Sequence, residues 1–420
     1  MSQRRVRSRQ GNRVGSLGSL RELNRRQVLR TLGEAGPVSR AEVARRTGLS
    51  RSTVSSLVAE LQSAGLVVEA EGAQREAPSD QGGRPGVLIA LDRSAGVAAG
   101  IDFGHRHLRV AVADLAHTIL AEAVTDREPD ARAEADLDTA VRLFDRVLAE
   151  AGADREQVLG IGMGLPAPID AASGTVGATA LLPGWVAVRA GEELGHRIGL
   201  PVLVDNDANL GALAEWTWGA GRDCTELAYI KVSSGIGAGL VLGGRLFRGA
   251  SGTAGEIGHI TVDESGPVCR CGNRGCLEVV AGAPAILELL RPVRGPGLTL
   301  RDVLEMSAAG DQATRRVLAD AGRQIGIALA NLCNLFNPER VVVGGQLGQV
   351  GDVLLDPMRE AVGRGAISTA AEAATIVAGR LGERAELLGA LALVLREPDR
   401  FLPTEHDDAV PPAPLRRVGT

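Results

Sequence analysis

The sequence lacks the features that would direct a protein into or across a membrane. It has no uninterrupted apolar run of the roughly 18 to 20 residues that a membrane-spanning helix needs. The arginines near its start, at Arg4, Arg5, Arg7 and Arg9, precede no apolar core of a secretion signal. We therefore expect a cytoplasmic protein with no membrane partner.

Cysteines are also few and odd in number. There are five, and three of them lie between residues 269 and 276. Disulfides are typical of secreted proteins, so we expect reduced thiols or metal ligands instead. With 420 residues, of which 45% are hydrophobic, the chain is too long to fold around a single ordinary hydrophobic core. The same composition excludes disorder for most of the chain. We predict a small domain joined to a larger, two-lobed α/β body.

Charge is distributed unevenly along the chain. Residues 1–66 carry thirteen arginines and four glutamates, a net charge of +9, so the remainder of this chain of net charge −5 carries −14. A basic segment on an acidic body favours a polyanionic partner, because phosphate contacts and counterion release dominate nucleic-acid affinity. We therefore expect double-stranded DNA as a partner; a solvated basic tail is the alternative.

Three segments have the composition of tails or linkers. Residues 1–19 hold glycine, serine and arginine without periodicity and are predicted to be a disordered basic tail. Residues 396–420 are predicted to be a flexible tail. Residues 72–86 offer only alanine for burial, so we interpret them as a wing or linker.

The remaining sequence passes twice through a similar order of elements. The first pass comprises strand-like stretches and one helix, near 87–91, 97–104, 108–115, 118–124, 133–151 (the helix) and 158–164. The second comprises strands and a long helical region, near 227–232, 237–242, 245–247, 280–337 (helical) and 340–343. This repetition predicts a duplicated α/β body, with a first lobe over 87–205 and a second over 206–395.

Residues 20–71 have the pattern of a winged helix-turn-helix domain. A first helix is expected near 20–33, with Leu23, Val28, Leu29 and Leu32 on its apolar side. A capping box formed by Ser39 and Glu42 predicts the start of a second helix, and Ser50 can cap a third.

The third helix has one apolar side and one polar side, as a recognition helix does. Its apolar positions follow i, i+3, i+4, i+7 spacing, at Val54, Leu57, Val58 and Leu61. Small polar residues and one arginine lie off this stripe and are our candidate DNA contacts: Arg51, Ser52, Thr53, Ser55 and Ser56. A three-helix interaction module that does not touch DNA is the alternative.

His259 and three cysteines form a candidate metal site. One imidazole and the thiolates of Cys269, Cys271 and Cys276 make a closed tetrahedral set suited to zinc, with no position left for metal catalysis. We interpret the zinc as structural; three unrelated buried thiols are the alternative.

These ligands belong to a longer string that resembles the pattern of the ROK family, whose name joins repressors, open reading frames and kinases: Gly255-Glu256-Ile257-Gly258-His259, then Cys269-x-Cys271-Gly272-x-x-Gly275-Cys276-Leu277-Glu278. Gly82-Gly83-Arg84-Pro85 resembles the family's linker motif. The resemblance covers roughly residues 20–395. It implies an actin/hexokinase-like (RNase H-like) body whose last helix can return to the first lobe, and a homodimer or homotetramer. It also implies that Arg84 can enter a minor groove, although a mere turn is an almost equal interpretation.

The resemblance further implies a sugar site. Its sugar-binding residues would be Asn206, Asp207, Glu256, His259 and Glu278. In the family's kinases the aspartate matching Asp207 is the general base. Without the family, the Asn-Asp cluster would be interpreted as a helix cap.

The two phosphate loops depart from the kinase pattern. The first has Asp102 and Gly104 but places Arg106 at the usual threonine, and the second reads Ser233-Ser234-Gly235-Ile236-Gly237 in place of Gly-Thr-Gly-x-Gly. A degenerate nucleotide site would consist of Asp102, Gly104, Ser234, Gly235, Gly237, Gly344 and Gly345. ATP and magnesium are expected only if kinase activity is retained.

We therefore predict a DNA-binding regulator, most simply a repressor of carbohydrate genes, that responds to a sugar or sugar phosphate. An ATP-dependent hexose or amino-sugar kinase, with Asp207 as its base, is the alternative. A regulator that answers to a protein partner through the same body is a third hypothesis.

Overall fold

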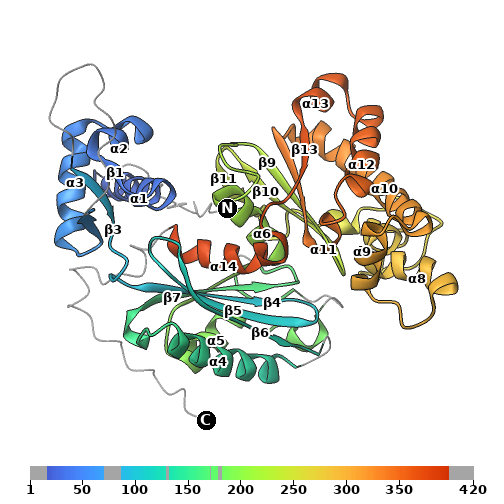
Figure 1. Cartoon of the computed structure of the whole chain (residues 1–420), viewed down its shortest axis with the longest axis horizontal. Helices are drawn as coiled ribbons and strands as arrows, with labels where there is room; N and C mark the ends of the chain where they lie inside the picture. Colours follow the sequence, from blue (N-terminus) through green and yellow to red (C-terminus); the bar gives the residue numbers. More distant parts are fainter. Residues whose placement is uncertain (1–16, 71–86, 129–131, 171, 178–181, 397–420) are drawn as a thin grey trace, which may run out of the picture. The chain divides into compact units, whose positions relative to one another are not determined.

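The computed structural model describes residues 17–70, 87–128, 132–170, 172–177 and 182–396 (Figure 1). The chain divides into two compact units, Met1–Ala95 and Gly96–Thr420. The segment predicted as a wing or linker, 72–86, lies outside the described residues, as does most of each predicted tail. Among the described residues, no helix combines the length and apolar character needed to cross a bilayer.

The first unit is a helix-turn-helix with a three-stranded antiparallel sheet of order β1-β3-β2. Its elements are α1 (Leu17–Ala35), β1 (Val38–Ser39), α2 (Arg40–Thr47), α3 (Arg51–Ser63), β2 (Val67–Glu69) and β3 (Leu88–Leu91). α2 ends at Gly48, whose φ of 71° is the left-handed conformation that glycine adopts readily. The four apolar residues of α3 are all buried, as their spacing predicts.

Four expectations about this unit need correction. β3, expected to begin the first lobe, pairs instead with β1 and β2, because its alternating burial completes the small sheet. The first helix begins at Leu17, inside the predicted tail. Leu23 is exposed, since 100° steps place it on the helix face opposite Val28 and Leu32. Glu42 accepts hydrogen bonds from Arg45 and Arg46, so only the Ser39 half of the capping box is present.

The first lobe of the second unit is a five-stranded sheet of order β6-β5-β4-β7-β8. Its elements are β4 (Val97–Phe103), β5 (His107–Asp114), β6 (Ile119–Asp126), α4 (Ala133–Glu150), β7 (Val158–Leu165), α5 (Ala190–Ile198) and β8 (Val202–Asn206). β4, β5 and β6 form an antiparallel meander, and β7 and β8 continue the sheet in parallel. α4 and α5 cover one face (Figure 1).

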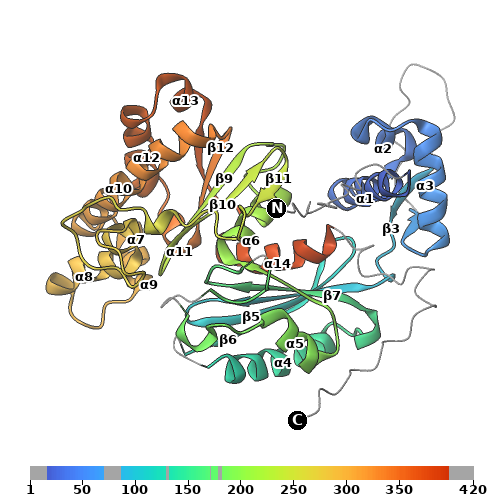
Figure 2. The same ribbon diagram turned by 180° about the vertical axis from the view of Figure 1, so that it is seen from behind.

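The second lobe repeats this topology, with strand order β11-β10-β9-β12-β13. Its strands are β9 (Leu227–Val232), β10 (Ile236–Leu242), β11 (Arg245–Phe247), β12 (Arg340–Gly344) and β13 (Thr375–Ala378). Its helices are α6 (Asp207–Thr217), α7 (Leu277–Ala281), α8 (Ala283–Arg294), α9 (Leu300–Ala308), α10 (Gln312–Phe336), α11 (Gly345–Gly348), α12 (Asp352–Gly365) and α13 (Ser368–Ala373). Figure 2 shows α7, α8 and α9 gathered beside α10.

The last strand of each lobe leads into a helix that packs on the other lobe. α6 follows β8 and packs on β9 and β10, whereas α14 (Ala385–Leu395) follows β13 and packs on β4 and β7. Glycines permit both contacts: a Cβ on Gly162 would lie 1.8 Å from the Ala390 carbonyl oxygen, and one on Gly239 would lie 2.4 Å from that of Ala208. α6 and α14 also contact each other, so the two lobes share a helical seam.

Arg396, assigned to the flexible tail, belongs to this seam. Its Nη1 donates a hydrogen bond to Thr217 Oγ1 at 2.9 Å, and its guanidinium lies 4.1 Å from the centre of the Trp216 ring. A cation over an indole face is a stabilising arrangement. The described chain therefore stays folded one residue beyond α14.

Candidate functional site

The exposed surface of α3 carries the predicted DNA contacts. Ser50 caps the helix by accepting a hydrogen bond from the Thr53 backbone N–H at 3.1 Å. Arg51, Ser52, Ser55 and Ser56 are exposed, whereas Thr53 is half-buried with its hydroxyl against that of Ser50 at 2.8 Å. Thr53 therefore serves first as part of the cap. Arg84 lies outside the described residues.

The structure brings the four predicted metal ligands together. The ligand atoms of His259, Cys269, Cys271 and Cys276 all lie within 4.8 Å of one another. His259 Nδ1 is 3.6 Å from Cys269 Sγ, and the sulfurs of Cys271 and Cys276 are 3.7 Å apart. Tetrahedral zinc, with bonds of about 2.3 Å to sulfur and about 2.0 Å to nitrogen, separates such atoms by about 3.5 and about 3.8 Å. The donor set and spacing therefore fit a zinc ion.

Tight backbone turns hold the cysteine loop. The Cys269 N–H donates to the Asn273 carbonyl at 2.7 Å, and the Gly272 N–H donates to the Cys269 carbonyl at 2.9 Å. Gly275 has φ of 62°, and a Cβ there would lie 1.5 Å from the Asp263 carbonyl oxygen. Only glycine fits this position, so the loop geometry depends on it.

Three predicted sugar-binding residues, Glu256, His259 and Glu278, belong to or adjoin this candidate metal site. Glu256 precedes the short helix Ile257–His259, and Glu278 lies in the first turn of α7. His259 directs Nδ1 toward sulfur, while its Nε2 is 3.8 Å from Glu256 Oε2. Burial, together with the charges of Asp207 and Glu278, raises the pKa of Glu256 to about 7. The imidazole thus connects the metal site to a cluster of carboxylates.

Asn206 and Asp207 lie where β8 meets α6. Asn206 Oδ1 accepts the Ala208 N–H at 2.9 Å as the helix cap, and its Nδ2 donates to the Ala167 carbonyl at 3.2 Å. The side chain of Asp207 is nearly buried, and its Oδ1 accepts the Ala208 N–H at 2.7 Å. Asn206 therefore caps α6, and Asp207 presents its carboxylate at the same helix start.

Sequence reasoning missed Lys231 and Glu386. Lys231 Nζ donates to Asp207 Oδ2 at 2.7 Å and lies 3.6 Å from Glu386 Oε1, at the start of α14. Glu386 also accepts the hydroxyl of the buried Tyr229 at 3.2 Å. One signal was available, because Lys231 is the only lysine in the sequence. Glu386 gave no comparable signal, since only the packing of α14 brings it here.

The first phosphate loop is covered by a histidine. His107 Nε2 lies 3.0 Å from Asp102 Oδ2, and a Cβ on Gly104 would lie 2.1 Å from the imidazole. The ring therefore occupies the approach to the Gly104 backbone. Arg106, which replaces the kinase threonine, is exposed. The sequence indicated the altered loop, but His107 and not Arg106 covers it.

The second phosphate loop and the paired glycines lie side by side, because β9 is flanked by β10 and β12. Ser234 and Gly235 form the tight turn between β9 and β10, where the Ser233 N–H donates to the Gly235 carbonyl at 2.9 Å. The predicted glycines follow at Gly237 on β10, at Gly344 at the end of β12 and at Gly345 at the start of α11. A Cβ on Gly235 would lie 2.5 Å from Glu278 Oε2, so this loop adjoins one of the predicted sugar-binding carboxylates.

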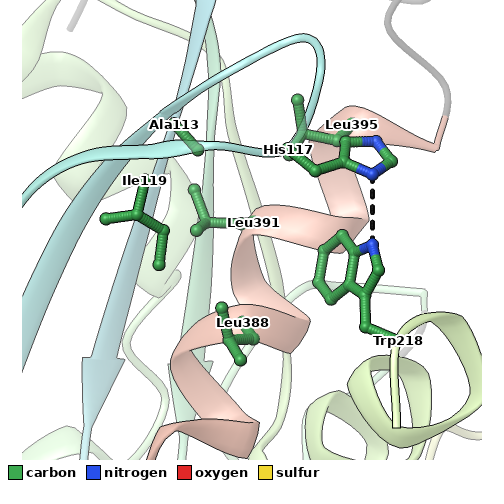
Figure 3. Close-up of a pocket in the computed structure, with 7 residues that line it drawn as sticks. All are labelled: Ala113, His117, Ile119, Trp218, Leu388, Leu391 and Leu395. Atoms are coloured by element: carbon green, nitrogen blue, oxygen red, sulfur yellow. Dashed lines mark hydrogen bonds between the residues drawn. The ribbon is translucent and has the colours of Figure 1, made fainter. Parts of the chain in front are cut away.

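A separate apolar pocket of about 180 Å³ lies between β5, β6, α6 and α14 (Figure 3). Its one titratable group is His117, whose Nδ1 accepts the Trp218 indole N–H at 3.1 Å. Burial lowers the pKa of His117 to about 4, so the imidazole is neutral at pH 7. The remaining lining residues are apolar: Ala113, Ile119, Leu388, Leu391 and Leu395.

Comparison with known proteins agrees with this arrangement. The ROK family model matches residues 98–397, most of the chain. The chain belongs to the ROK family. Its winged-helix unit matches the MarR family model over residues 22–76, so this ROK protein joins a MarR-type DNA-binding fold to the ROK body.

Relatives of this ROK protein align over nearly its whole length. It is 30% identical to the xylose repressor of Caldicellulosiruptor bescii, over 91% of this chain and 98% of that protein. It is 29% identical to the N-acetylglucosamine repressor of Escherichia coli O6:H1, over 91% and 95% respectively. Each alignment is longer than the ROK body of this chain, so each includes part of the winged-helix unit as well.

Two solved structures resemble the fold. A ROK family transcriptional regulator, described as a homologue of the E. coli MLC protein, aligns with a TM-score of 0.74 and 26% identity over 90% of this chain and 97% of its own. A ROK glucokinase of Streptomyces griseus, solved with glucose and AMPPNP, aligns with a TM-score of 0.62 and 30% identity over 71% and 99%. The alignment with the regulator covers 90% of this chain and so includes part of the winged-helix unit. The alignment with the kinase covers 71% of this chain, which is about the length of the ROK body alone.

Proposed function

We propose that this ROK protein is a sugar-responsive transcription repressor of carbohydrate genes, with a structural zinc ion supporting its sugar pocket. One observation carries the proposal: a helix-turn-helix with an exposed polar recognition surface belongs to the same chain as a carboxylate cluster that adjoins a candidate metal site. The first feature suits a DNA duplex, and the second suits a ligand rich in hydroxyl groups.

The pocket chemistry supports a sugar effector. Asp207, Glu256 and Glu278 offer hydrogen-bond acceptors within one charged cluster, and His259 adds a ring nitrogen beside Glu256. Sugar hydroxyls donate to carboxylates in charge-assisted bonds, which are the stronger class. The two relatives, named as repressors for xylose and for N-acetylglucosamine, support the same class of effector. Zinc bound by His259 would fix the orientation of the imidazole.

The kinase alternative has less support. Phosphoryl transfer needs backbone donors open to phosphate and a carboxylate free to take a proton. Here His107 covers Gly104, and Lys231 holds Asp207. Incubation with ATP, magnesium and a panel of sugars is the direct test. Turnover near the usual kinase range of about 1 to 100 per second would overturn this choice.

The DNA arm of the proposal is tested with a duplex selected from a random library by the full-length protein. Arg51→Ala should weaken binding by roughly 5- to 150-fold, because one good base contact contributes roughly 1 to 3 kcal/mol. Arg301→Ala, an exposed arginine of α9, is the matched control and should bind normally. Equal gel-shift affinity for both variants would move recognition away from α3.

The effector arm uses the same duplex with xylose, N-acetylglucosamine and their phosphates. An active sugar should release the DNA without ATP, and should stabilise the protein by about 2.7 kcal/mol at a hundred times its dissociation constant. Glu256→Ala should abolish both effects, whereas Glu305→Ala, on the exposed side of α9, should not. Unaltered release in Glu256→Ala would place the effector elsewhere. A two-fold symmetric operator would further support the predicted homodimer.

A further inference from the structure

Lys231 is placed at the centre of the ROK body. It is the penultimate residue of β9, where Gly237 and Gly344 flank it on the neighbouring strands. Its side chain is only 17% exposed and reaches Asp207 and Glu386, the acidic residues at the starts of α6 and α14. The two seam helices therefore both direct a carboxylate at one ammonium group.

A third carboxylate, that of Asp102, also acts on the Lys231 ammonium group. Asp102, on β4 of the first lobe, is 1% exposed, and its charge acts on Lys231. His107 engages Asp102 Oδ2, but the buried Oδ1 has no hydrogen-bond partner among the described residues. Burial alone would lower the pKa of Lys231, yet the carboxylates outweigh it and raise the pKa. Lys231 is therefore a charged counter-ion shared by both lobes.

Enzymes that transfer phosphoryl groups place a divalent cation among carboxylates, where this protein has the Lys231 ammonium group. Magnesium binds between substrate phosphates and one or two protein carboxylates, with phosphate loops alongside. Here the carboxylates lie beside the two former phosphate loops, and a fixed ammonium group already neutralises them. An ammonium group supplies positive charge, but it has no ligand positions through which to hold a phosphate and a carboxylate together.

We propose that the Lys231 ammonium group takes the place of a divalent cation among Asp102, Asp207 and Glu386, and so makes this pocket a sugar receptor instead of a phosphotransferase. The proposal deepens the proposed function and rests on it for the sugar. Lys231 Nζ donates to Asp207 Oδ2 at 2.7 Å and so takes an acceptor position that a general base would offer to a sugar hydroxyl. The same charge repels a metal ion, so the sugar meets carboxylates without a catalytic cation.

Removal of the charge tests this directly. Lys231→Met keeps the length of the side chain and leaves three carboxylates without a counter-ion. The full-length, zinc-loaded variant should bind one Mn²⁺ per chain by isothermal titration calorimetry, about tenfold or more tighter than the unmodified protein, because the carboxylates then face the ion without the competing ammonium charge and the net ligand charge sets affinity for hard cations. Zinc stays on its thiolates, which prefer it to manganese. The site should vanish in Lys231→Met/Asp102→Asn.

Matched controls make the outcome decisive. Lys231→Arg retains the charge and should bind no Mn²⁺ in this pocket. A folded Lys231→Met protein without the new site would overturn the proposal. So would tight Mn²⁺ binding by the unmodified protein that is lost in Asp102→Asn, a measurement that does not need Lys231→Met to fold. Failure of sugar to release DNA would instead count against the proposed function and leave these metal titrations unaffected.

Discussion

The two lobes of the body have one topology and opposite charges at equivalent positions. In each, an antiparallel meander is extended by two parallel strands, and the fifth strand leads into a helix that crosses to the other lobe. Asp102 is the penultimate residue of β4 and pairs across to Gly164, whereas Lys231 is the penultimate residue of β9 and pairs across to Gly344. The backbone plan is repeated, but the chemistry is not.

The lobes also differ in the segment that comes after the meander. The first lobe proceeds from β6 to the crossover helix α4, whereas the second inserts the cysteine loop, α7, α8 and α9 before α10. Glu256, His259 and Glu278 all belong to this insertion. Three of the five predicted sugar-binding residues therefore lie in a segment that the first lobe lacks.

Loss of the predicted zinc ion should produce the largest difference in behaviour between the two lobes. Cys271 is the exposed member of the predicted ligand set, so Cys271→Ser should change coordination with little effect on packing. Apparent zinc-binding free energies of about 10 to 16 kcal/mol couple to folding in small zinc domains. We expect loss of one zinc per chain by elemental analysis, loss of sugar response, and faster hydrogen exchange in α7, α8 and α9 but not in α4.

Cys333→Ala provides the control, because Cys333 is buried in α10 away from the metal site and should retain zinc. A zinc-free, well-folded Cys271→Ser protein with a normal sugar response would contradict the role assigned to the insertion. Equal loss of protection in both lobes would contradict the comparison between them.

Replacing the glycine at the helical seam by alanine should destabilise both lobes to a similar extent. Gly162→Ala and Gly239→Ala each push a Cβ into backbone carbonyl oxygen, which a side-chain shift cannot relieve. Each should lower the free energy of unfolding by about 1 to 3 kcal/mol, measured by denaturant titration. Gly363→Ala, within α12 and facing open space, should raise it by roughly 0.5 to 1 kcal/mol. If Gly239→Ala were neutral, the two seam contacts would not be equivalent.

The last difference between the lobes concerns the turns that follow their second strands, and its effect on stability is expected only as the pH is lowered. Gly243 and Gly244 take positive φ between β10 and β11, whereas His117, with φ of 65°, does so between β5 and β6. The folded-state pKa of His117, about 4, lies below the ordinary value of 6.5, so protonation favours unfolding as pH falls through this window. Between pH 7 and 5 the native protein should lose about 2 kcal/mol more stability than His117→Asn, which tolerates the same φ. Parallel pH profiles would rule out this linkage.

Much of the fold and site was predictable because local chemistry specifies it. The spacing of Val54, Leu57, Val58 and Leu61 defined α3, and four ligands within eighteen residues defined the metal site. Other features could not be read locally. β3 looked like the start of a lobe because a strand pattern does not reveal its partner strands, and His107 was overlooked because only the turn of β4 into β5 folds it over Gly104.

The sequence by itself determined the candidate metal ligands, the caps of α2 and α3 at Ser39 and Ser50, and the duplicated order of strands, since each depends on residues close together in the chain. The tertiary structure alone decided which charges meet. Lys231, Asp207, Glu386 and Asp102 come from four elements separated by up to 284 positions. Their interaction exists only because α6 and α14 cross between the lobes, and electrostatic energy depends on distance in space, not on distance along the chain.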